Sequence, residues 1–177
     1  VGIDQVAPVE RIGSEYIFVR GVGPDEIERP LIIAHEDNTE VYVNGALYAT
    51  LANGGDFVSI DAGYYGVSYP ADGNEGPPLG QSSNMYVNTS NPVFAFHVIG
   101  GERPGGSGGY SGIPNQGLFF VPPINCQTPK IVDNIPFINQ IGTASFSGVI
   151  TLVTEAGSTV LINDLDISNY NVTAQPV

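Results

Sequence analysis

Glycine and proline are spread along the whole chain and leave only short uninterrupted stretches between them. The 177 residues include 23 Gly and 14 Pro. Both residue types destabilise helix interiors, and no window shows a sustained 3.6-residue apolar period with helix caps. The stretches in between are rich in β-branched and aromatic residues, which is typical of strands. Strands are therefore predicted at 16–20, 31–35, 40–44, 46–51, 57–60, 85–88, 93–99, 118–121, 148–154 and 158–162.

The segments between these strands carry turn signals. Asn44 and Gly45 separate two alternating runs, and an Asn-Gly pair tolerates the positive φ angles of a tight hairpin turn. Residues 52–55 (Ala-Asn-Gly-Gly) predict a longer hairpin loop. Asn91 and Pro92 are predicted to separate two strands, because proline has a fixed φ and no N–H to give to a ladder.

An internal repeat is the most informative feature. Residues 31–45 (LIIAHEDNTEVYVNG) align without gaps with residues 150–164 (ITLVTEAGSTVLIND). Each copy is interpreted as an apolar strand, a tight polar turn and a second strand, and such a hairpin cannot bury its apolar face alone. Duplicated structural units are therefore expected. The identical pairs in this alignment are Glu36 with Glu155, Val41 with Val160, and Asn44 with Asn163.

These patterns predict an all-β fold. We expect an antiparallel β-sandwich, jelly-roll-like, with part of a second related β-sandwich unit. The first unit is predicted at residues 1–115, and the start of the second, truncated unit at residues 116–177.

The charge of the chain restricts its partners. It has 5 Lys and Arg against 18 Asp and Glu, a net charge of -13. Nucleic acid is excluded as a partner because no basic stripe can neutralise phosphates. No run approaches 18 apolar residues, so no membrane insertion is expected. The single cysteine, Cys126, allows no disulfide within the chain, and its role stays open between a buried thiol and a bond to a cysteine elsewhere.

The candidate site residues lie in or beside two stretches without strand character, residues 70–83 and 100–116. Asp72, Asn74 and Glu75 form the densest cluster of oxygen ligands in a loop and are the candidate site for calcium, the one possible cofactor; the alternative is a solvated acidic loop. The candidate ligand-binding residues share an aromatic ring with a polar tip, which gives large contact area at low entropic cost, and the alternative is packing at the rim of a sheet. They are Tyr64, Tyr65, Tyr69 and Tyr110.

Catalysis is not expected. The two histidines, His35 and His97, lie inside strand runs, and no Gly-x-Ser-x-Gly elbow is present. Glu36 and Glu155 recur at equivalent positions of the repeat, which favours a turn role over acid–base chemistry. A carbohydrate-active enzyme is the least favoured of the functions considered.

Several segments resemble one known family. Residues 115–123 (NQGLFFVPP) and 132–142 (VDNIPFINQIG) carry the resemblance most specifically, with support from 14–21, 31–45 and 143–164. Together they resemble the N-terminal region of the IgGFc-binding protein family, found in animal mucin-like secreted proteins and in large surface proteins of gliding Bacteroidetes-type bacteria exported by the type IX pathway. The absence of a cysteine framework is more similar to the bacterial members.

This resemblance implies a secreted or cell-surface adhesion and binding module of a larger multidomain protein. Its partner would be a protein or glycan ligand at the cell surface. The alternative is a structural spacer or filament-forming subunit of a surface assembly, in which neighbouring copies pair through their edge strands.

Overall fold

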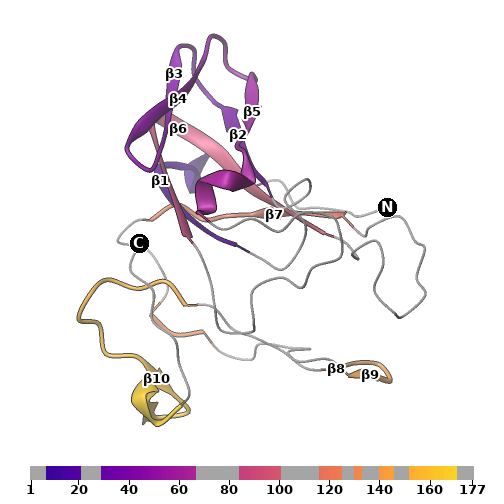
Figure 1. The fold of residues 1–177 in the computed structure, drawn as a ribbon, viewed down its shortest axis with the longest axis vertical. Helices are drawn as coiled ribbons and strands as arrows, with labels where there is room; N and C mark the ends of the chain where they lie inside the picture. Colours follow the sequence, from indigo (N-terminus) through magenta and orange to yellow (C-terminus); the bar gives the residue numbers. More distant parts are fainter. Residues whose placement is uncertain are drawn as a thin grey trace.

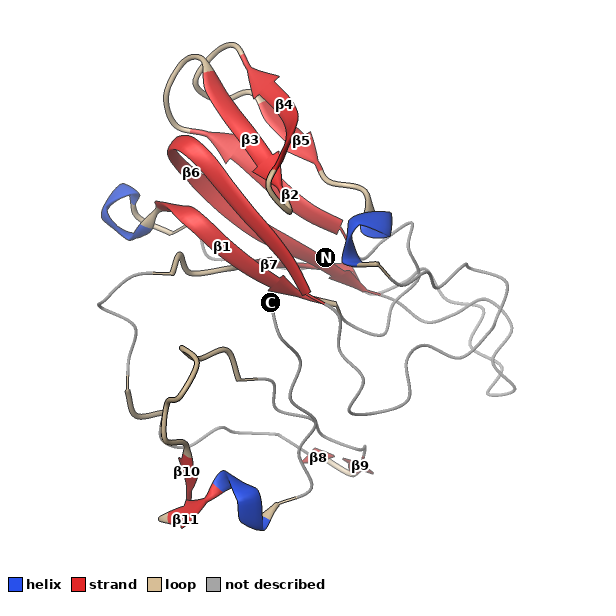
Figure 2. Ribbon diagram, turned by 60° about the vertical axis from the view of Figure 1, so that its left-hand side comes forward, coloured by secondary structure: helices blue, strands red, loops and turns tan. Residues whose placement is uncertain are grey.

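The structure of the chain is a computed structural model that describes residues 7–20, 29–66, 84–100, 116–124, 130–132, 140–145 and 152–170. Its strands are antiparallel, which confirms the predicted all-β antiparallel fold (Figures 1 and 2). One sheet has seven strands, and two hairpins of two strands each lie apart from it. The large sheet consists of β1 (Gly13–Val19), β2 (Arg29–Ala34), β3 (Thr39–Val43), β4 (Ala46–Leu51), β5 (Phe57–Ser59), β6 (Asn84–Gly100) and β7 (Gln116–Phe120). The hairpins are β8 (Gln140–Ile141) with β9 (Ala144–Ser145), and β10 (Leu161–Ile162) with β11 (Leu165–Asp166); the short helices are η1 (Val9–Arg11), η2 (Ala62–Tyr65) and η3 (Ile167–Asn169).

The central strand β6 runs unbroken for 17 residues. The predicted separation at Asn91 and Pro92 is therefore wrong. The strand instead changes partners there: residues 84–89 pair with β1 and β3, and residues 93–100 pair with β2 and β7, with Gly13 of β1 also opposite Val93. Pro92 has no N–H to donate, and the hydroxyl of Thr89 donates to the carbonyl of Asn91 at 2.7 Å. The proline thus marks a change of partner within one strand.

Strands β2 and β3 follow one another along the same edge of β6. Ala34 lies opposite Val93, and Val41 lies opposite Thr89, so both strands run antiparallel to β6 in one direction. The hairpin predicted for the first copy of the repeat is wrong, because β2 and β3 do not pair with each other. Residues 35–38 form an excursion between two collinear strands.

Strands β4 and β5 return along the outer side of β3 and β2. Leu51 lies opposite Thr39, and Ser59 lies opposite Leu31. The predicted hairpin loop at 52–55 is also wrong, since this segment lies beside residues 35–38. Its backbone bonds are Asn38 N–H to Ala52 O at 3.1 Å, Gly55 N–H to Ala34 O at 2.8 Å, and Gly54 N–H to the carboxylate of Asp37 at 2.8 Å.

Residues 29–59 are therefore one long, interrupted hairpin whose tip is the Asn-Gly turn. Asn44 has a φ of 49° and Gly45 a φ of 83°, with Val43 opposite Ala46. Positive φ at both central residues is the geometry that favours Asn-Gly in two-residue hairpins. The predicted tight turn is confirmed.

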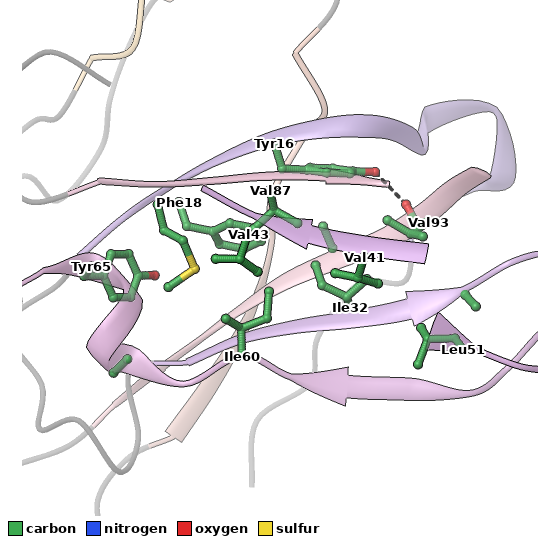
Figure 3. Close-up of a cluster of buried hydrophobic side chains, with 14 residues drawn as sticks. Tyr16, Phe18, Ile32, Val41, Val43, Leu51, Ile60, Tyr65, Val87 and Val93 are labelled. Carbon is green, nitrogen blue, oxygen red and sulfur yellow. Dashed lines mark hydrogen bonds between the residues drawn. The ribbon is translucent and has the colours of Figure 1, made fainter. Parts of the chain in front are cut away.

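The strands change partners or are interrupted at three segments that lie side by side across the sheet. We call these segments, residues 35–38, 52–56 and 89–92, the bend. On both sides of the bend, alternate side chains of β1, β2, β3 and β6 point to the same buried cluster (Figure 3). The curled sheet therefore forms both layers of its own core. Each fully buried Val, Ile or Phe contributes roughly 1.5–3 kcal/mol. The cluster consists of Tyr16, Phe18, Ile32, Ala34, Val41, Val43, Leu51, Ile60, Ala62, Tyr65, Met85, Val87, Val93 and Ala95.

Strand β7 belongs to the large sheet, where it pairs with the second half of β6. Residues 116–120 therefore lie in the same sheet as β1 to β6, whereas the sequence predicts them at the start of a second unit. A strand was predicted at 148–154, but the described residues 152–154 do not form one. Of the strand predicted at 158–162, only Leu161–Ile162 is a strand. The division into two β-sandwich units stays a prediction, and Cys126 lies outside the described residues.

Candidate binding site

Asn44 holds the tip of the long hairpin to two other elements. Its backbone N–H donates to the carbonyl of Tyr86 at 2.8 Å, and its side-chain oxygen accepts from the N–H of Tyr86 at 3.0 Å. Its side-chain nitrogen donates to the carbonyl of Tyr64 at 2.9 Å. One asparagine in a left-handed turn thus connects β3, β6 and η2.

Two tyrosines meet beside this asparagine. Tyr48 is the extra residue at a bulge of β4, and Tyr64 lies in η2. Their rings are 5.3 Å apart at 89°, the edge-to-face arrangement that aromatic pairs favour. The hydroxyl of Tyr48 donates to the carbonyl of Ser59 at 3.3 Å. We call Asn44, Tyr48 and Tyr64 the tyrosine rim.

The backbone of Tyr64 is fixed while its side chain is open to solvent. Asp61 caps η2 by accepting from the N–H of Gly63 at 2.7 Å, and the N–H of Tyr64 donates to the carbonyl of Asp61 at 3.2 Å. The side chain of Tyr64 is 42% exposed. An aromatic ring held on a rigid support loses little entropy when it makes a contact.

Tyr65, the neighbour of Tyr64, is not an open surface residue. It is 3% exposed and belongs to the core cluster. Its hydroxyl lies 3.3 Å from Nε2 of His97, and the guanidinium carbon of Arg20 lies 5.7 Å from its ring centroid. Tyr65 therefore packs in the core, and its predicted role in ligand contact stays a prediction.

The other predicted site residues cannot be placed. Tyr69 and Tyr110, and the calcium candidates Asp72, Asn74 and Glu75, lie outside the described residues. In the described ranges no group of three or more His, Cys, Asp and Glu side chains could hold a metal ion. The calcium site stays a prediction.

A second polar surface covers the outer side of the first half of the sheet, on the face opposite the core. The hydroxyl of Tyr42 donates to the carboxylate of Glu40 at 2.6 Å, and this bond, with burial and the negative charge of Glu40, raises the pKa of Tyr42. Burial, the charge of Glu15 and a hydrogen bond with it raise the pKa of Tyr86. Asn88 lies opposite both Tyr42 and Glu15. We call these five residues the polar face.

Of the two histidines predicted inside strands, His97 lies in β6, whereas the prediction for His35 is wrong, because β2 ends at Ala34 and His35 begins the bend. His35 is exposed and its ring is 6.2 Å from that of Phe94. His97 is 7% exposed, with the ring of Phe18 edge-on at 6.0 Å and the hydroxyl of Tyr65 as a polar neighbour. The backbone carbonyls of Glu36 and Glu155 both accept a hydrogen bond within a turn. The donor is the hydroxyl of Thr39 for Glu36 and the N–H of Ser158 for Glu155.

Seven residues of these surfaces were not among the predicted sites. They are Asn44, Tyr48, Glu15, Glu40, Tyr42, Tyr86 and Asn88. The alternation of β3 could have identified Tyr42, since it stands between the buried Val41 and Val43 and so faces outward. Tyr48 has no such signal, because its position depends on a bulge that shifts the register of β4.

These features define a class of protein: an antiparallel β-sheet module with a rigid core and open polar, tyrosine-bearing surfaces of the kind that bind other molecules. More specifically, the chain belongs to the IgGFc binding protein family, whose model matches residues 1–177, the whole chain. This is a family of extracellular binding modules and not an enzyme family.

Two further comparisons gave no match. Neither a curated protein nor a solved structure is significantly similar to the chain. In the described ranges, no helix has the length and apolarity required to cross a bilayer.

Proposed function

We propose that the chain is a cell-surface or secreted adhesion module that binds a protein or glycan ligand through the tyrosine rim. Family membership supports the binding role. The observation that carries the assignment to the rim is the exposed ring of Tyr64, held edge-to-face against Tyr48.

The tyrosine rim has the properties of a preorganised contact surface. Tyrosine combines an apolar ring with a hydroxyl, so it contacts both the faces of sugar rings and protein side chains. The support is rigid because Asn44 and Asp61 fix the backbone on both sides of Tyr64. Burial of such anchors in a complex is what gives interfaces most of their binding energy.

The charge of the chain favours a partner of a particular kind. A net charge of -13 repels acidic ligands over long distances, and the effect weakens as salt screens it. Neutral glycans and protein surfaces with basic patches therefore fit better than sulfated or sialylated glycans. We expect binding to a protein ligand to weaken as ionic strength rises.

A binding measurement with matched variants tests this function. The whole chain is applied to a neutral-glycan array and, because of the family's name, to an immunoglobulin Fc fragment. For any ligand found, Tyr64→Ala is expected to raise Kd at least tenfold. Tyr170→Ala is the control, since Tyr170 is similarly exposed (38%) but lies outside the rim. Equal effects of the two substitutions would contradict the assignment to the rim.

A structural role is the second candidate, and the free edge of the sheet favours it. Among the described residues, β4 and β5 each pair on one side only, and they expose Leu47 at 56% and Phe57 at 69%. Exposed edge strands with apolar side chains can pair with another chain. In this case the purified chain would form filaments. The double variant Leu47→Lys with Phe57→Lys would abolish the filaments, and its circular dichroism spectrum would stay that of the parent.

A further inference from the structure

The polar face lies over the middle of the large sheet and not at its edge. On β6, Asn88 lies opposite Glu15 of β1 and Tyr42 of β3, so the three side chains share one side of the sheet. Tyr86, two residues before Asn88, points to the same side. The residues on either side of Asn88 in β6 are buried, which directs this side away from the core. The polar face is therefore a surface formed by three adjacent strands.

Each carboxylate of the polar face is held by a tyrosine. The hydroxyl of Tyr42 donates to Oε2 of Glu40 at 2.6 Å, and Tyr86 hydrogen-bonds with Glu15. An ionised carboxylate has two oxygens and about four positions for donors. One tyrosine hydroxyl therefore leaves each carboxylate able to accept further hydrogen bonds, while it fixes the carboxylate beside an aromatic ring.

The strands of the polar face carry negative charge and no positive charge. Glu15 and Glu40 lie in β1 and β3, and neither these strands nor β4 nor residues 84–91 contain Lys, Arg or His. In the described ranges, the two glutamates belong to no group of three acidic, His or Cys side chains that could hold a metal ion. The face therefore complements an organic cation better than a metal ion, which needs more ligands.

Arginine is the organic cation that fits both parts of this surface. Its planar guanidinium donates two parallel N–H bonds to a carboxylate and stacks on an aromatic ring. A lysine ammonium has the same charge, but it is a compact and strongly hydrated group without a planar face. A carboxylate fixed beside a tyrosine ring thus favours arginine over lysine.

We propose that the polar face binds arginine side chains of a protein partner. Glu15 and Glu40 accept the guanidinium N–H groups, and the rings of Tyr86 and Tyr42 stack on the guanidinium planes. Asn88 lies between the two pairs, where its amide donates to and accepts from the backbone of the same partner segment.

This surface is separate from the tyrosine rim, although the two adjoin through the bonds of Asn44 to Tyr86. Binding of arginine needs no ligand at the rim. The inference therefore goes beyond the proposed function, because it adds a second contact surface and names the side chain that binds there.

Chemical-shift titration of the whole 15N-labelled chain tests this binding. The probe is a synthetic glycine peptide with two arginines, and the control is the same peptide with citrulline, the neutral analogue of arginine. We expect saturable shift changes at the amides of Tyr42, Tyr86 and Asn88 with the arginine peptide and none there with the citrulline peptide. The equivalent lysine peptide is expected to bind about threefold more weakly. No saturable change at these amides, or lysine binding as tight as arginine binding, would overturn the proposal.

Matched variants separate the surface from the net charge of the chain. Glu15→Gln with Glu40→Gln removes two charges but keeps side-chain oxygens that accept from the tyrosine hydroxyls, so urea denaturation should show an intact fold. This double variant should raise the Kd of the arginine peptide about fivefold. Glu36→Gln with Glu155→Gln removes the same charge at two exposed glutamates outside the polar face, and it should raise this Kd by less than about 1.5-fold. Equal increases would mean that the peptide responds to net charge alone, which contradicts the proposal. The titration contains no ligand of the rim, so its failure leaves the test with Tyr64→Ala unaffected.

Discussion

The hydroxyl of Tyr16 joins the carbonyl of Val93 across the bend of the sheet (Figure 3). Tyr16 itself lies opposite Val87, in the first half of β6, whereas Val93 begins the second half. The same hydroxyl oxygen accepts from the N–H of Gly13 at 2.8 Å. One buried side chain therefore connects β1 to both halves of the strand around which the sheet curls.

Tyr16→Phe is expected to lower the free energy of unfolding by about 1–3 kcal/mol, because it leaves the buried carbonyl of Val93 and the partly buried N–H of Gly13 without the hydroxyl. Urea denaturation measures this change. The control is Tyr42→Phe, whose hydroxyl bonds the carboxylate of the half-buried Glu40 on the outer face of the sheet; it leaves no fully buried group without a partner and should cost less than Tyr16→Phe. Equal costs for the two variants would show that the bond across the bend does not stabilise the fold.

Tyr16 also predicts how stability depends on alkaline pH. Burial raises the pKa of Tyr16 from 10.0 to about 12, and its hydrogen bond with Gly13 acts in the opposite direction. Between pH 10 and about 12 the unfolded chain therefore loses this proton while the folded chain keeps it, so the free energy of unfolding falls as pH rises. The fall should be shallower for Tyr16→Phe in urea denaturation over this range. Parallel curves for the two proteins would contradict the assigned pKa.

Two substitutions of Asn44 distinguish the stability that comes from its left-handed backbone angle from the stability that comes from its side-chain hydrogen bonds. Asn44→Ala removes the bonds to Tyr64 and Tyr86 and places an unfavourable residue at a φ of 49°. Asn44→Gly removes the same bonds but accepts the angle. Chemical denaturation should show Asn44→Ala to be less stable than Asn44→Gly by about 1 kcal/mol. Equal stability would mean that the left-handed angle carries no cost at this turn.

The bend is closely packed at Gly54. A Cβ atom there would lie 2.7 Å from the backbone carbonyl oxygen of His35, a contact that no rotation of a side chain relieves. Gly54→Ala should therefore lower the free energy of unfolding by about 1–3 kcal/mol. Thr50→Ala, at an exposed position of β4, is the control and should change it by less than about 0.5 kcal/mol. A Gly54→Ala protein as stable as the parent would contradict the side-by-side packing of residues 35–38 and 52–56.

Local patterns were sufficient to predict the strands of the large sheet. Alternation of apolar residues located β1 to β5 and β7, and the positive φ preference of Asn-Gly located the tip at Asn44. These signals are local, because side-chain period and turn geometry depend on neighbouring residues. Pairing depends on residues far apart, so the sequence did not reveal that β2 and β3 share one edge of β6. The proline rule failed at Pro92 because the strand changes partners there.

The candidate site was predicted only in part, for the same reason. Tyr64 and Tyr65 are adjacent in sequence, yet one is 42% and the other 3% exposed. Their difference arises from η2, whose one turn directs the second ring toward His97. Asn44 entered the prediction as a turn residue, and its contacts with Tyr64 and Tyr86 depend on how three distant elements meet.

Backbone chemical-shift mapping tests the central claim, binding at the tyrosine rim, most directly. The 15N-labelled chain is titrated with the Fc fragment or with the tightest glycan from the array. The largest shift changes are predicted for the amides of Asn44, Tyr48 and Tyr64, with smaller ones on the polar face. Changes confined to the β8–β9 and β10–β11 hairpins, with the rim unaffected, would contradict it.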